Sequence, residues 1–120
     1  MVAGLVDQGW YVLAPVAGIL GAFISGSNTV SNIMFGSLQF DAAIQAGIPV
    51  IPTLALQTLG GAAGNMICVH NVVAVLTTVG LVGKEGKVIK NNLLVSLGYA
   101  VLAGIFTIIV VNIIGIKFLL

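Results

Sequence analysis

The chain has 120 residues, of which 59% are hydrophobic and 6% are charged, and its formal net charge is +1. Soluble domains contain about 25% charged residues. This composition, with a mean hydropathy of +1.22, therefore excludes an ordinary soluble domain and indicates an integral membrane protein. The small net charge gives no reason to expect nucleic acid as a partner, and the single cysteine excludes an internal disulfide bond. Because the apolar runs are continuous, we expect an all-α integral membrane fold in contact with membrane lipid.

The first uncharged run extends from Gln8 to Phe40, between Asp7 and Asp41. As one helix it would be ~50 Å long, which exceeds the ~30 Å hydrocarbon core, and two full spans would need about 40 residues plus a turn. We therefore predict a re-entrant helical hairpin over residues 10–40. Its tip would lie near the middle of the membrane, and its second arm would return to the surface where the first began.

The predicted tip of the hairpin is polar, in a region otherwise suited to lipid. Six hydroxyl or amide side chains lie close together there: Ser25, Ser27, Asn28, Thr29, Ser31 and Asn32. In hydrocarbon an unpaired polar group costs several kcal/mol, so such a cluster is expected only where it is buried in protein or lines a wet cavity. We interpret it as a binding site for a small carboxylate or ion; the alternative is a polar contact between helices.

The second uncharged run is predicted to form a broken helix over residues 50–83, after Pro49 and Pro52, which suit the start of a new helix. Its break is glycine-rich and contains four further candidate site residues: Gly60, Gly61, Gly64 and Asn65. A half-helix that begins at Asn65 would direct partial positive charge toward an anion. Gly60 and Gly64 also form a GxxxG pattern, so helix packing and ligand binding both remain open.

The segment Lys84–Lys90 contains three lysines and one glutamate, and the positive-inside rule predicts that it is a cytoplasmic loop. Residues 93–116 follow without a charge and would be ~36 Å long as a helix, enough for a full transmembrane span. This orientation places the C-terminus outside the cell and makes the hairpin enter from the outside.

His70 and Asp41 are the candidate proton-relay residues. An imidazole titrates near physiological pH, whereas the alternative for His70 is an ordinary side chain satisfied by neighbouring hydroxyl or amide groups. Asp41 is expected at the membrane interface, and it becomes the leading carboxylate for proton coupling if the hairpin prediction is wrong. Cys68 and His70 are expected on different faces of a helix, so we predict no metal site, no cofactor and no enzyme activity.

Three motifs resemble those of the L-lactate permease family. They are Gly21–Asn32 (GAFISGSNTVSN), Gly60–Ile67 (GGAAGNMI) and Val79–Glu85 (VGLVGKE). The resemblance implies the C-terminal part of a permease that imports lactate, and often glycolate, together with protons across the plasma membrane. It also implies a partner, which would be the missing N-terminal half of the permease or a second copy of the chain.

The triplet Ser27-Asn28-Thr29 is also distantly similar to a Ser-Asn-Thr motif in sodium-coupled carboxylate transporters. Those proteins have two inverted repeats, each with the triplet at a hairpin tip before a broken helix, where Na⁺ and carboxylate bind. The likeness implies that residues 1–120 form a single membrane domain equivalent to one partial inverted repeat. The coupling ion is expected to be H⁺, with Na⁺ still open. The alternative function is a non-transporting subunit or degenerate fragment that only packs against partner helices.

Overall fold

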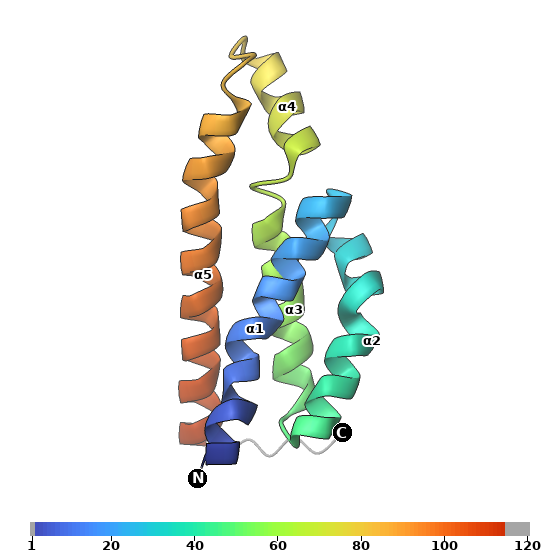
Figure 1. Ribbon diagram of the computed structural model, residues 1–120, viewed down its shortest axis with the longest axis vertical. Helices are drawn as coiled ribbons and strands as arrows, with labels where there is room; N and C mark the ends of the chain where they lie inside the picture. The colour runs from blue at the N-terminus through green and yellow to red at the C-terminus, as the bar shows by residue number, and fades with distance from the viewer. Residues whose placement is uncertain (1, 115–120) are drawn as a thin grey trace.

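The computed structural model describes residues 2–114, which form five α-helices and no β-strand. The helices are α1 (Val2–Ser25), α2 (Asn28–Ala46), α3 (Val50–Gly64), α4 (Val69–Thr78) and α5 (Glu85–Ile114). In Figure 1, α1 rises, α2 descends, α3 and α4 rise one after the other, and α5 descends along the whole length of the molecule. The all-α class predicted from the composition is thus confirmed.

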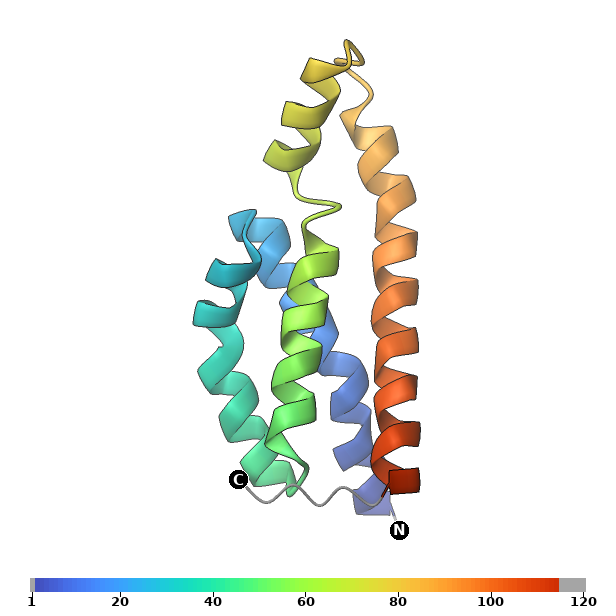
Figure 2. The same ribbon diagram turned by 180° about the vertical axis from the view of Figure 1, so that it is seen from behind.

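The molecule is elongated, measuring 52 × 24 × 22 Å, and α1 packs against α2, α3 and α5. Figure 2 shows the fold from behind, and in both views the turn between α1 and α2 lies at the height of the break between α3 and α4. The fold therefore brings the polar turn at residues 25–28 to the level of the break at residues 65–68, although the two are far apart in the sequence.

Two helices, α1 and α5, are long and apolar enough to cross a membrane, and α3 with α4 passes the same test as a pair bent by 40°. α5 contacts the rest of the molecule along one narrow side, where Ser96, Ala100 and Gly104 are buried. Its other side is apolar and open, and there Leu102 is 69% and Ile113 is 78% exposed. Such a surface suits contact with lipid or with other membrane helices.

Glycines set the close contact between α1 and α3. A Cβ atom on Gly60 would overlap the carbonyl group of Pro15, and one on Gly64 would press on the backbone of Ile19. On the α1 side, a Cβ atom on Gly18 would overlap a backbone carbonyl of α3. The two backbones therefore touch directly, which is the contact that small residues permit between membrane helices. We call this contact of Gly18, Gly60 and Gly64 the glycine seam.

The helix boundaries in the first part of the chain differ from the expected ones. α3 continues through Gly64, so the break lies at residues 65–68 and not at Gly60–Asn65. The reason is that glycines in a tight seam support helix packing and need not bend the helix. α1 begins before residue 10, and α2 continues past residue 40 because a helix can pass through a single exposed aspartate such as Asp41. Whether this pair re-enters the membrane stays a prediction.

α5 also begins earlier than expected. Its first residue is Glu85, so most of the segment Lys84–Lys90 is helical and not a loop. The Gly83 N–H donates to Glu85 Oε1 at 2.9 Å, and an acidic residue in the first turn is favourable next to the helix dipole. The expected end of this span, at residue 116, lies outside the described residues.

A chain of buried hydrogen bonds joins α1, α2 and α3. Trp10 Nε1–H donates to Gln39 Oε1 at 2.9 Å, and Gln39 Nε2–H donates to Gln57 Oε1 at 3.0 Å. Gln57 Nε2–H donates to Ser31 Oγ at 3.1 Å, and the Ser31 hydroxyl donates to the Gly18 carbonyl at 2.9 Å. Both glutamines are at most 1% exposed. We call this set the buried hydrogen-bond chain; it fixes the hairpin helices to α3.

Replacing Gln57 with leucine should destabilise the protein, because it removes an acceptor from Gln39 and a donor from Ser31 at a buried position. Leaving one buried partner unsatisfied costs about 1–3 kcal/mol. The matched control is Gln45→Leu, since Gln45 is exposed on α2. In detergent, Gln57→Leu should lower the midpoint of thermal unfolding clearly more than Gln45→Leu does. Equal shifts would contradict a stabilising role for the buried hydrogen-bond chain.

Candidate functional site

The turn between α1 and α2 is seated on the first turn of α4. Asn71 Nδ2–H donates to the Gly26 carbonyl at 3.4 Å. Gly26 adopts a left-handed conformation, with φ of 72°, and a Cβ atom there would overlap the imidazole of His70. The candidate site therefore lies where three pieces meet: the turn, the break at residues 65–68 and the start of α4 (Figure 1).

The serine hydroxyls of the polar cluster form hydrogen bonds within the hairpin helices and their turn. The Ser25 hydroxyl donates to the Gly21 carbonyl one helical turn earlier, at 2.7 Å. Ser27 is the N-cap of α2, and its hydroxyl oxygen accepts from the Val30 N–H at 3.3 Å. Ser31 belongs to the buried hydrogen-bond chain. These hydroxyls shape the turn and anchor it, and Thr29 lies on the exposed side of α2.

The asparagines of the predicted site differ from the serines because their buried side-chain oxygens lack hydrogen-bond partners among the described residues. Within the described residues, the buried Oδ1 atoms of Asn28, Asn32 and Asn65 have no hydrogen-bond donor. Asn28 Oδ1 lies directly over Gly61, where a Cβ atom would overlap it. Asn28 and Asn32 are one turn apart on α2, and Gly61 and Asn65 are one turn apart at the end of α3. The site therefore offers buried acceptors that a ligand hydroxyl, a water molecule or a cation can satisfy.

The two candidate proton-relay residues are not brought together. The His70 ring lies against Cys68, with Nδ1 at 3.3 Å from the Cys68 Sγ. The two were expected on different faces of a helix, but Cys68 lies in the break, where helical spacing does not apply. Asp41 lies about 20 Å along α2 from the turn, exposed at the edge of a groove with Ser37 and Phe40.

The two helix ends that flank the break carry partial charges of opposite sign. α3 ends at Gly64, so its C-terminal carbonyls give partial negative charge to the region around Asn65. α4 begins at Val69, and in the described part of the chain its first turn has no side-chain hydrogen-bond cap. Free N–H groups at a helix start attract anions. The anion-attracting helix start expected at Asn65–Met66 thus lies at Val69, next to His70.

Four residues of this region were not singled out from the sequence as site residues. Gln39 and Gln57 belong to the buried hydrogen-bond chain. Asn71 and Asn92 join Asn65 around a cavity of about 180 Å³ between α4 and α5. The only signal in the sequence is an amide side chain in an apolar run, and without the helix boundaries it does not show which amides face one another. Residues 8–114 contain no group of three His, Cys, Asp or Glu side chains suited to a metal ion.

Comparison with known proteins gives one consistent result. The family model described as L-lactate permease matches residues 2–114. A putative L-lactate permease of Haemophilus influenzae is 41% identical over 103 residues, covering 86% of this chain and 19% of that protein. The L-lactate permease of Bacillus subtilis is 34% identical over 107 residues, covering 89% of this chain and 19% of that protein.

The similarity extends beyond proteins named for lactate. The glycolate permease GlcA of Escherichia coli is 35% identical over 96 residues, which cover 80% of this chain and 17% of that protein. The chain thus spans about a fifth of the length of these relatives. No solved structure matches significantly.

Substituting Gly26 with alanine should both strain the turn and displace His70. A non-glycine residue in the left-handed region costs about 1–2 kcal/mol. Gly47→Ala is the matched control, because Gly47 has φ of 65° with no atom near a would-be Cβ. Both variants should lose stability, but only Gly26→Ala should move His70 off the buried Cys68 and speed its reaction with a maleimide. Equal labelling rates in the two variants would contradict this seating of the turn.

Proposed function

Since the chain belongs to the L-lactate permease family, we propose that it forms part of the substrate site of a permease for lactate or a related 2-hydroxy monocarboxylate. The similarity to a glycolate permease supports this substrate class, because glycolate and lactate share a carboxylate with a hydroxyl on the neighbouring carbon. The protein acts in this proposal as a plasma-membrane transporter and not as an enzyme. Its coupling ion is a proton.

The chemistry of the site supports a 2-hydroxy acid. The chain contains no arginine, so the carboxylate has no bidentate guanidinium partner here. In our proposal the free N–H groups at the start of α4 bind the carboxylate. The substrate hydroxyl then donates to the buried Oδ1 of Asn28. That acceptor without a donor among the described residues, facing Gly61 across the contact between α2 and α3, is the observation on which the proposal chiefly rests.

The remaining walls of a closed site come, in our proposal, from the rest of the permease or from a second copy of the chain. Alternating access needs two bodies that move against each other around the substrate. The chain spans about a fifth of its relatives, and its α5 surface is exposed and apolar. His70, beside the turn, is the nearer candidate for a proton relay, and Asp41 is the more distant one. The alternative is a subunit that only packs against partner helices.

Asn28→Ala in the whole permease tests the proposal. Lost hydrogen bonds to a charged ligand are worth about 1.5–3 kcal/mol, so the apparent lactate affinity in proteoliposomes should fall about 10- to 150-fold. Asn91→Ala makes the same chemical change at an exposed position on α5 and should leave uptake unchanged. If the cluster only packs helices, Asn28→Ala would remove an unsatisfied acceptor, and transport would persist with equal or higher thermal stability.

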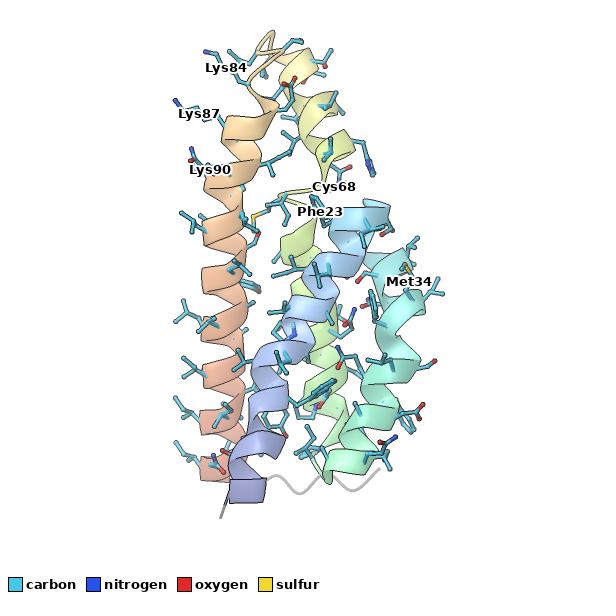
Figure 3. All side chains as sticks on the ribbon, viewed as in Figure 1. Phe23, Met34, Cys68, Lys84, Lys87 and Lys90 are labelled. Atoms are coloured by element: carbon cyan, nitrogen blue, oxygen red, sulfur yellow. The ribbon has the colours of Figure 1, made fainter. Side chains whose placement is uncertain are left out.

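We further propose that the lysine-rich start of α5 faces the cytoplasm, because positively charged residues favour that side. Figure 3 shows Lys84, Lys87 and Lys90 together at this end of the molecule. In a Cys68→Ala background, Lys87→Cys should react with a membrane-impermeant maleimide only after the cells are opened. A cysteine at Leu120 should react in intact cells. The reverse pattern would overturn the orientation.

A further inference from the structure

A positively charged patch lies at the end of the molecule where α4 and α5 are joined. It consists of Lys84, Lys87 and Lys90, which are all exposed, and we call it the lysine patch. Figure 3 shows the three side chains on one side of the start of α5, the side that faces away from α4. The one acidic residue in this segment is Glu85, whose carboxylate accepts from the Gly83 N–H at 2.9 Å. The patch therefore has an excess of positive charge.

The length of α5 determines the depth of the lysine patch in a membrane. α5 contains 30 residues and is about 45 Å long. The hydrocarbon core of a bilayer is about 30 Å thick, and the bilayer with its headgroups is about 40–45 Å thick. Residues 93–114 contain no charge, and at about 33 Å they are long enough to cross the hydrocarbon core. When they fill the core, the first two turns of α5 lie in the headgroup layer.

Apolar residues beside the lysines favour the same depth. The loop between α4 and α5 exposes Leu81 and Val82, and Val82 is 71% exposed. Bulk water disfavours such side chains, and the hydrocarbon core disfavours lysines. The headgroup layer accommodates both kinds of residue, because apolar groups there reach the acyl chains while lysine ammonium groups reach the phosphates.

The lysine patch continues into an apolar stripe on the exposed side of α5. Lys87, Leu94 and Val101 follow one another at intervals of seven residues, so they share one face of the helix. Both apolar members are exposed, and Leu94 is 73% exposed. An acyl chain packed along this stripe would place the phosphate of the same lipid molecule beside Lys87.

We propose that the lysine patch binds the headgroup of an anionic phospholipid. The phosphate complements the three ammonium groups, and the partial positive charge at the start of α5 adds to the attraction. A zwitterionic phospholipid has no net charge and would leave the excess positive charge of the patch uncompensated. The competing partner is an acidic segment of the rest of the permease. The apolar stripe favours the lipid, because it offers a place for the acyl chain as well as for the headgroup.

Lipid binding can be measured on the purified 120-residue chain in a neutral detergent, without lactate. Phosphatidylglycerol should raise the midpoint of thermal unfolding more than phosphatidylcholine with the same acyl chains, since a ligand that binds the folded state stabilises it. NaCl should reduce the difference, because it screens exposed charges. Equal effects of the two lipids, as expected if the patch pairs with an acidic protein segment, would overturn the proposal.

Substitutions test whether the lysine patch is the site. Lys87→Gln should weaken the apparent phosphatidylglycerol affinity about fivefold, and glutamine at all three positions should weaken it about 100-fold. Arginine at all three positions keeps the charge and should keep the affinity within a few-fold. Lys117→Gln, which removes the fourth lysine, should have no effect.

Two further outcomes would overturn the proposal. One is a preference for phosphatidylglycerol that persists when all three lysines are replaced with glutamine. The other is equal, saturable stabilisation by inorganic phosphate, which would indicate a site for a soluble anion and not for a lipid. Because lactate is absent, either result would leave the proposed transport function untouched.

Discussion

The need to satisfy polar groups inside an apolar bundle governs this structure. Gln39 and Gln57 are fully buried between helices, where neither water nor lipid could replace a missing partner. Each amide can be accommodated only because the other is placed opposite to it, and because Ser31 continues the series to the backbone of α1. The geometry of the first three helices follows from this mutual dependence, and the glycine seam brings α1 and α3 close enough for it.

The same constraint explains why serine and asparagine have different roles around the turn. A serine hydroxyl can donate to a carbonyl of its own helix, as Ser25 does to Gly21, and it then needs no other partner. An asparagine amide has both donors and an acceptor, and one local bond leaves part of it unsatisfied. Asn28 and Asn65 are in this condition, each with a buried oxygen that lacks a donor in the described part of the chain. The hydroxyls are therefore satisfied within the local structure, and in our proposal the amide oxygens are left for a ligand.

Much of the architecture could be predicted from the sequence, for reasons that are local. The turn follows from the polar run at residues 25–32, and the last helix follows from its long apolar stretch. The position of the break could not be predicted, because Gly60 and Gly64 are equally suited to bending a helix and to packing it. Side chains that are far apart in the sequence give no local signal that they will meet. The hydrogen bond between Gln39 and Gln57 could therefore not be predicted either. Which residues bind substrate stays a prediction.

The buried hydrogen-bond chain also bears on the order in which the protein assembles. Every residue in it lies between Trp10 and Gln57, and the glycine seam is complete at Gly64. Synthesis proceeds from the N-terminus, so these three helices can associate in the membrane before the ribosome has finished α5. α5 then docks onto a preformed surface, where Ser96 donates to the carbonyl of Ala63 at 3.1 Å. The last helix then completes both hydrophobic core clusters, because Ala100 and Ala103 of α5 pack against residues of α1 and α3.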